Sequence, residues 1–185
     1  MEDAVFRPVQ PCALKRLRIQ GILSFGRTGV DLEFGRLNVL IGPNGSGKSN
    51  LLEVLSVMKA APRNLTAAIH SSGDAGDWLW KGRGPLEAGL IEAVLDTGSL
   101  GGGDLAHRIR LGNQGFRVVV EGEAIERRPE GGEPVKRVFA LTQDSYELRD
   151  RKGGVRSLSP GLFSSGGVRA VPDQGRGCLR GAYLF

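Results

Sequence analysis

The chain has 185 residues, which is enough for one domain with a single core. Hydrophobic residues make up 40% and charged residues 24%, proportions that are typical of a soluble globular protein and exclude disordered and fibrous classes. No apolar run approaches the roughly 18 residues of a membrane span, and the first residues lack the pattern of a secretion signal. We therefore expect a cytoplasmic protein with no membrane partner.

The positive charge of the chain is confined to its end. Residues 1–150 contain 19 basic and 19 acidic residues, whereas residues 151–185 contain 6 basic residues and Asp173 alone. The last segment also holds 8 of the 29 glycines and little apolar periodicity. These differences predict a folded lobe over 1–150 and a poorly ordered Gly/Arg-rich tail over 151–185. The net charge of +5 is therefore no reason in itself to infer DNA binding.

Three strands are predicted before residue 42. Residues 14–22 and 30–34 alternate apolar with charged residues, the pattern of half-buried strands. Residues 37–41 are a short apolar run of the kind that lies buried inside a sheet. In the first strand Lys15, Arg16 and Arg18 either approach a phosphate or only solvate one face, and the second interpretation is favoured.

A helix and an antiparallel β section are expected to follow. From Lys48 the apolar residues fall on one helical stripe, and Pro62 is expected to end the helix. Residues 63–84 indicate a loop with one turn of helix, in which Trp78 and Trp80 are more often packing residues than base-stacking ones. Glycine turn signals separate a series of predicted short strands: residues 86–95, 107–111, 116–122 and 135–142.

Metal and disulfide chemistry is not supported by the residue types. Cys12 and Cys178 form no C-x-x-C pair, and only His70 and His107 could assist them. We expect neither a zinc site nor a disulfide framework, and we expect the two histidines to be surface or satisfied residues.

A phosphate-binding loop is the strongest signal in the sequence. Residues 42–49 fit G-x-x-x-x-G-K-S/T, the Walker A pattern, between an apolar run and an amphipathic helix. Glycines let the backbone wrap around phosphate oxygens, Lys48 can reach the β- and γ-phosphates, and the Ser49 hydroxyl can ligate Mg²⁺. A glycine-rich turn that binds nothing is the weaker alternative. The residues predicted to bind the nucleotide are Gly42, Asn44, Gly45, Ser46, Gly47, Lys48, Ser49 and Asn50, with Ser49 as the metal ligand.

The first part of the chain resembles the amino-terminal segment of RecF/SMC-like ABC-type ATPases. The resemblance lies in the apolar positions of residues 14–25 and 30–34 and in the run 37–52 with its GPNGSGKSN loop. The resemblance is closest to predicted AAA-type ATPases, and it is specific over residues 14 to about 60. It implies an α/β P-loop NTPase fold, namely the amino-terminal lobe of an ABC-type ATPase head with an antiparallel β section. It further implies ATP, Mg²⁺ and a homodimer that sandwiches the nucleotide.

Other motifs of that family are missing or weak here. No four-residue apolar run precedes Asp-Glu as in a Walker B strand, and Val94-Leu95-Asp96 is a poor candidate. Gln143 is a weak candidate for the Q-loop, because a solvent-facing glutamine at a strand end is at least as frequent. Ser164–Gly167 only superficially resembles a signature motif, and Ala182–Phe185 could be a Walker B strand without its acids. The catalytic residues therefore stay unknown, and we hypothesise a truncated or frame-shifted copy of a longer ATPase.

Three functions are compatible with these observations. The favoured one is an ATP-binding module that hydrolyses ATP only in a complete, dimeric head. The alternative is a nucleic-acid-binding protein that uses the basic tail, with ATP as a regulator and DNA as partner. A GTPase or kinase is third, and the absence of an Asn-Lys-x-Asp motif argues against the GTPase.

Overall fold

The computed structural model describes residues 13–71, 78–82, 88–97, 103–114, 117–129, 134–142, 146–149 and 154–158. These residues form an eight-stranded sheet and a helix, α1 (Lys48–Ser71). The strands are β1 (Ala13–Gln20), β2 (Val30–Glu33), β3 (Ala88–Asp96), β4 (Asp104–Gln114), β5 (Arg117–Arg128), β6 (Lys136–Leu141), β7 (Tyr146–Arg149) and β8 (Val155–Leu158).

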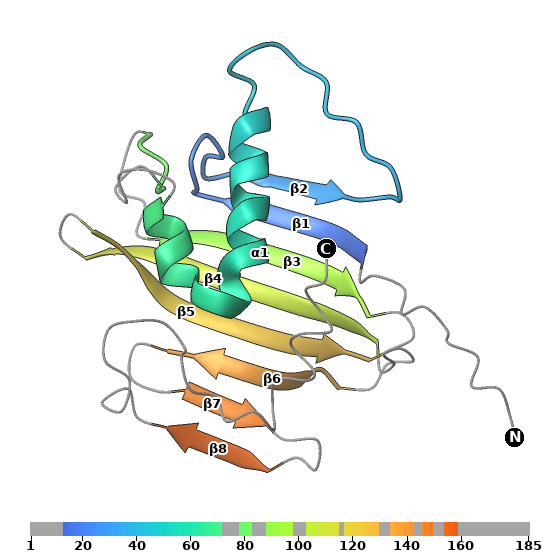
Figure 1. Cartoon of the computed structure of the whole chain (residues 1–185), viewed down its shortest axis with the longest axis vertical. Helices are drawn as coiled ribbons and strands as arrows, with labels where there is room; N and C mark the ends of the chain where they lie inside the picture. The colour runs from blue at the N-terminus through green and yellow to red at the C-terminus, as the bar shows by residue number, and fades with distance from the viewer. Residues whose placement is uncertain are drawn as a thin grey trace, which may run out of the picture.

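The sheet is antiparallel between all of its neighbouring strands, in the order β2-β1-β3-β4-β5-β6-β7-β8 (Figure 1). From β3 onward each strand pairs with the next one along the chain, as in an antiparallel meander. The predicted antiparallel section is confirmed: the four short strands expected between residues 86 and 142 correspond to β3, β4, β5 and β6, of which β4 and β5 are longer than predicted.

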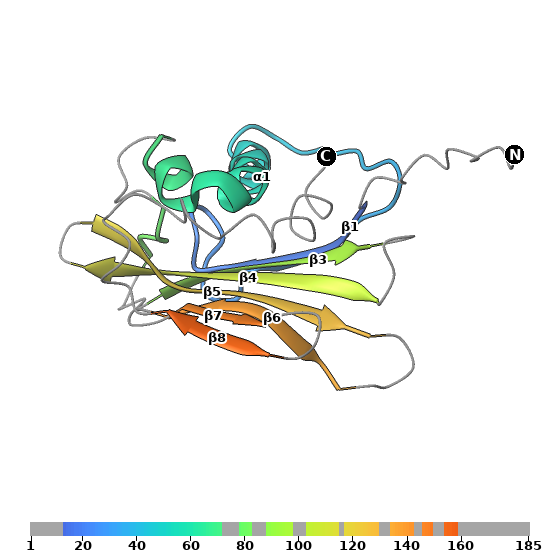
Figure 2. The ribbon, with the colours of Figure 1, turned by 60° about the horizontal axis from the view of Figure 1, so that its bottom comes forward.

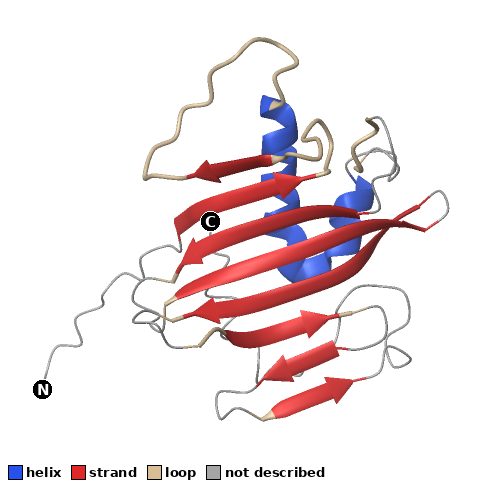
Figure 3. Cartoon of the chain, turned by 180° about the vertical axis from the view of Figure 1, so that it is seen from behind, coloured by secondary structure: helices blue, strands red, loops and turns tan. Residues whose placement is uncertain are grey.

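Helix α1 covers one face of this sheet, as the two turned views show (Figures 2 and 3). On β1 the alternation predicted from the sequence is confirmed, since Leu17 and Ile19 are buried while Arg16 and Arg18 are exposed. The buried side chains of β1 join those of α1, β3, β4 and β5 in one apolar cluster. Its members on the helix are Leu51, Val54, Val57, Met58, Ala61, Leu65 and Ile69.

The strand predicted over residues 37–41 is wrong. This segment forms no strand, and four of its side chains are exposed, with Leu37 at 85% and Ile41 at 89%. Figure 1 shows it as part of a long arc that leaves β2 and returns to the first turn of α1. An apolar run becomes a buried strand only where a neighbouring strand satisfies its backbone groups, and no described strand pairs with it.

The prediction that Pro62 ends the helix is also wrong, because α1 continues to Ser71. Residues 63–71, expected to lie in a loop, therefore belong to the helix. Proline inside a helix removes one backbone hydrogen bond and bends the axis rather than always ending the helix. The ribbon of α1 bends sharply part-way along its length (Figure 1). Burial of Leu65 and Ile69 beyond the proline keeps the second part helical against the sheet.

The sheet continues past residue 150, since β8 pairs with β7 over residues 155–158. The proposed division at residue 150 stays a prediction, and residues 159–185 lie outside the described part of the chain. Within the residues that the structure describes, no helix combines the length and apolarity that a bilayer crossing requires.

Two adjacent leucines at the start of α1 test the packing of the helix. Leu51 is 4% exposed and faces the sheet, whereas Leu52 is 55% exposed. We expect Leu51→Ala to lower the free energy of unfolding by about 2–4 kcal/mol, because it leaves a cavity. Leu52→Ala should change it by less than about 0.5 kcal/mol. Urea unfolding followed by circular dichroism measures both, and equal losses would contradict the packing described here.

Candidate nucleotide-binding site

The loop of residues 42–47 joins the exposed arc to the first turn of α1. Gly45 and Gly47 have φ angles of 81° and 90°, a region that residues with a side chain rarely adopt. A Cβ atom at Gly42 would also lie 2.9 Å from the Ser46 hydroxyl oxygen. Glycine is therefore required for two separate reasons: the positive φ angle at Gly45 and Gly47, and the lack of space for a side chain at Gly42.

Lys48 turns back over the loop that precedes it. Its Nζ donates hydrogen bonds to the carbonyl oxygens of Gly42, at 2.6 Å, and Pro43, at 2.7 Å. A longer contact, 3.3 Å, reaches the hydroxyl of Ser46. The ammonium group is therefore held at the centre of the loop by groups of the loop itself. The half-buried Lys48 side chain thus provides a fixed positive charge at the amino terminus of the helix.

The amino terminus of α1 adds to this positive field. The helix begins where the Leu51 N–H donates to the Gly47 carbonyl at 2.9 Å, so the N–H groups of residues 48–50 have no partner in a preceding turn. The first turn contains no acidic residue that would neutralise the helix dipole. Ser49 is exposed there. The arrangement is suited to an anion at the loop and to a cation bound beside it.

Asn50, which is predicted to contact the nucleotide, makes a hydrogen bond to a turn from another part of the chain. Its Nδ2 donates a hydrogen bond of 2.8 Å to the Ser24 hydroxyl. Ser24 lies in the short turn that follows β1, and the sequence interpretation did not single it out. The sequence does contain a signal for it: Ser24 is a hydroxyl residue between Gly21 and Gly26, directly after the strand that carries the family resemblance.

In the described part of the chain, acidic residues are not gathered into a metal-binding cluster. Among the described residues no group of three or more His, Cys, Asp or Glu could hold a metal ion. Asp96, the weak Walker B candidate, ends β3 with its carboxylate 3.7 Å from Lys15. Gln143, Ser164–Gly167 and Ala182–Phe185 lie outside the described residues.

Two of the basic residues of β1, Lys15 and Arg16, are engaged with acidic partners on the sheet. Arg16 makes a two-pronged contact with Asp31, with N–O distances of 2.6 and 2.5 Å, which lowers the pKa of Asp31. Lys15 lies 2.8 Å from Asp104. Arg16 and Arg18 alternate with the core-facing Leu17 and Ile19, so they lie on the sheet face opposite α1. Of the two interpretations left open, solvation of a face agrees with these contacts.

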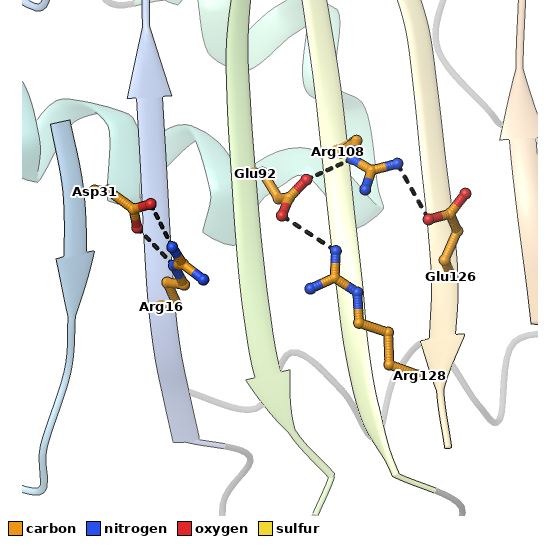
Figure 4. Close-up of polar contacts among 6 residues, drawn as sticks. All are labelled: Arg16, Asp31, Glu92, Arg108, Glu126 and Arg128. Atoms are coloured by element: carbon orange, nitrogen blue, oxygen red, sulfur yellow. Dashed lines mark hydrogen bonds and ion pairs between the residues drawn. The ribbon is translucent and has the colours of Figure 1, made fainter. Parts of the chain in front are cut away.

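The same face carries a charged network, drawn in Figure 4, which spans β3, β4 and β5. Arg108 connects Glu92, at 2.5 Å, with Glu126, at 3.1 Å, and Arg128 reaches Glu92 at 3.2 Å. Partial burial raises the pKa of Glu92, but the hydrogen bonds and charges of Arg108 and Arg128 outweigh this, so its pKa lies below the usual range.

Two further residues have structural roles. Trp78 is buried and its indole N–H donates to the Ile69 carbonyl at 3.0 Å, so it packs against the end of α1, as favoured from the sequence. His107 is buried with Nε2 2.6 Å from a Glu123 carboxylate oxygen, which confirms it as a satisfied residue.

An α/β fold with a Walker A-type loop at the start of a helix defines the class of P-loop NTPases. The chain belongs to the family described as "AAA domain, putative AbiEii toxin, Type IV TA system", whose profile matches residues 37–151. The resemblance to AAA-type, SMC-like ATPases inferred from the sequence is thereby confirmed, and with it the fold class.

Two individual proteins are similar to the chain. It is 39% identical over 93 residues to the chromosome partition protein Smc of Rhodopirellula baltica, covering 48% of this chain and 7% of that protein. The chain thus spans a small part of that relative. A structure solved in work on ATP-driven dimerization and DNA-stimulated activation of SMC ATPases is 21% identical, with a TM-score of 0.48, covering 64% of this chain and 72% of the other.

The charged network predicts a pH-dependent contribution to stability. Because the pKa of Glu92 is lowered by folding, its contribution is complete above the unfolded pKa, near 4.5, and is lost as the pH falls through the folded pKa. We expect Glu92→Gln to lower the free energy of unfolding at pH 7 by up to about 1 kcal/mol. The difference from wild type should shrink below pH 4.5.

Urea unfolding at pH 7, 5 and 3 measures this difference. Glu53→Gln removes a carboxylate of α1 outside the network and serves as the control. A difference for Glu92→Gln that is constant across the three pH values would contradict the role given to the ionised carboxylate.

Proposed function

We propose that the chain is the ATP-binding module of a RecF/SMC-like AAA/ABC-type ATPase of the cytoplasm, binding Mg-ATP through residues 42–49. The observation that carries this proposal is the position of the Lys48 ammonium between the carbonyls of Gly42 and Pro43, at the entrance of a helix without acidic residues in its first turn. A lysine that served only packing would have no reason to lie there.

The hydrogen-bond donors of the loop support the proposal of triphosphate binding. An ammonium group has three protons, and two of them engage carbonyl oxygens at 2.6 and 2.7 Å. The third makes only the 3.3 Å contact with the Ser46 hydroxyl. In our proposal a phosphate oxygen takes the place of this weakest contact, while the backbone N–H groups of residues 45 and 47–49 donate to the remaining oxygens.

Magnesium fits the site only in part. The exposed Ser49 hydroxyl is one oxygen ligand of the type that Mg²⁺ accepts, and phosphate oxygens and water would complete an octahedron. The ion neutralises phosphate charge in this class of reaction, but hydrolysis also needs a group that orients the attacking water. Since the described residues contain no acidic cluster for this task, we propose that hydrolysis occurs only in a complete, dimeric head.

The exposed run of residues 37–41 supports the same proposal. Leu37, Val39, Leu40 and Ile41 expose between 46% and 89% of their surface directly before the loop. Contiguous apolar residues of this kind usually mark a surface that another part of an assembly covers. We propose that the remainder of the head packs here. The nucleic-acid alternative rests on the basic tail of residues 151–185, of which only residues 154–158 belong to the described part of the chain.

Replacing the loop lysine tests nucleotide binding. We expect Lys48→Ala to weaken Mg-ATP binding at least about 30-fold, because the fixed charge at the loop disappears, in line with the loss of a strong hydrogen bond to a charged group. Isothermal titration calorimetry measures the affinity. Lys59→Ala, at an exposed position of the same helix, is the matched control and should bind like wild type. Undiminished binding by Lys48→Ala would contradict the assigned role.

Turnover by the isolated chain should stay near the uncatalysed background. The physical reason is the lack of assembled carboxylates beside Ser49 among the described residues. Release of inorganic phosphate from Mg-ATP, measured over a range of protein concentrations, checks this. Robust magnesium-dependent release by a monomeric preparation would show that the chain contains a complete hydrolytic site.

A further inference from the structure

The turn that follows β1 is closed by its own backbone. The N–H of Ile22 donates to the Phe25 carbonyl at 3.0 Å, and the N–H of Phe25 donates back to Ile22 at 2.8 Å. The N–H of Gly21 donates to the Gly26 carbonyl at 3.0 Å. Only Leu23 and Ser24 therefore project from the end of this narrow hairpin.

This hairpin is held in a strained conformation. Leu23 has a φ of 50°, and it is the only residue other than glycine with positive φ among the described residues. A side chain is costly in this region, and such a residue persists only when its surroundings enforce it. Here the Leu23 N–H donates to the Trp78 carbonyl at 2.7 Å, and the Trp80 N–H donates to Gly21 at 3.1 Å. The buried Trp78 thus anchors the turn to the core.

The tip of the hairpin lies directly against the phosphate-binding loop. A Cβ atom at Gly47 would lie 3.0 Å from the Ser24 hydroxyl oxygen and 3.7 Å from the Phe25 ring. Asn50, three residues further on, holds the same hydroxyl at 2.8 Å. Two segments that are far apart in sequence thus meet where the helix begins.

The direction of the Asn50 bond determines what the serine can do. The Asn50 amide nitrogen can only donate, so the Ser24 oxygen accepts and its own hydrogen stays available. Ser24 is exposed, and its hydroxyl oxygen lies beside Gly47. The wall of the loop therefore presents a hydroxyl donor that does not belong to the Walker A pattern.

We propose that Ser24 donates this hydrogen to a phosphate oxygen of the bound nucleotide, and that Asn50 is a positioning residue that orients the Ser24 hydroxyl. The inference deepens the proposed function and rests on it. It also replaces the direct nucleotide contact predicted for Asn50. The strained turn fixes the donor before the ligand arrives, so that little ordering is needed on binding.

Alanine substitution of the serine is the first test. Ser24→Ala should weaken Mg-ATP binding about tenfold, the lower end for a hydrogen bond to a charged acceptor. Competition with inorganic tripolyphosphate should show the same weakening, because that probe has neither base nor ribose. Ser56→Ala is the matched control, since its hydroxyl bonds back to the Leu52 carbonyl of the same helix. An unchanged affinity of Ser24→Ala for either ligand would overturn the assignment.

A double-mutant cycle tests the role of Asn50. Asn50→Ala should weaken binding about threefold in the wild-type background and should have no effect when Ser24 is already alanine. A loss that persists in the Ser24→Ala background would mean that Asn50 contacts the nucleotide itself, and would overturn its positioning role. Thermal unfolding without ligand shows whether each variant folds, and Ser24→Thr, which keeps the hydroxyl, should retain most of the affinity.

The two levels of the proposal fail in different ways. If wild type binds no ATP, or if Lys48→Ala binds as well as wild type, the proposed function and this inference are both overturned. If Lys48→Ala loses binding while Ser24→Ala does not, only the role of Ser24 is overturned.

Discussion

The packing of α1 on the sheet is the constraint on which the rest of the structure depends. One stripe of the helix, from Leu51 to Ile69, buries its apolar side chains against β1, β3, β4 and β5. Because Leu51 is fixed in this way, the first turn of the helix, which begins at Lys48, is fixed as well. The phosphate-binding loop can then be an irregular, glycine-rich segment, since the helix and not the loop supplies the rigidity.

The two faces of the sheet divide the work. The face beneath α1 is mainly apolar. It also contains His107, which is hydrogen-bonded to Glu123. The opposite face holds arginines and carboxylates on neighbouring strands, where Arg108 contacts two carboxylates and Glu92 contacts two arginines. Such cross-strand pairs fix strand register, because a slip by one residue would bring apolar side chains to this face and charged ones to the core. The basic residues of β1 are part of this arrangement and are thereby removed from the group of candidate phosphate ligands.

The hydrophobic and glycine patterns of the sequence predicted those elements whose buried face is set by residues of the element itself. The alternation in residues 14–20 gave β1 with the correct inward face, and the glycine signals gave the antiparallel order of β3 to β6. The motif of residues 42–49 placed a loop at the start of a helix. The end of α1 was misplaced, because burial of Leu65 and Ile69 outweighs the cost of an internal proline, and this burial depends on strands far away in sequence. Ser24 was missed for a related reason: its importance arises only from a contact with Asn50 across 26 positions of chain.

The wrong prediction at residues 37–41 is informative for the same physical reason. Sequence pattern reports what a segment needs, and this segment needs a neighbouring strand and burial. The described sheet ends at β2 and offers neither, so the apolar side chains remain exposed directly before the loop. The exposed apolar surface of residues 37–41 therefore connects the burial of this segment with the nearby phosphate-binding loop. Whatever covers the run also lies next to Lys48 and Ser49, so the same contact that buries the apolar side chains can bring in the carboxylates that a hydrolytic site requires. Completion of the sheet and completion of the catalytic site would then be a single event.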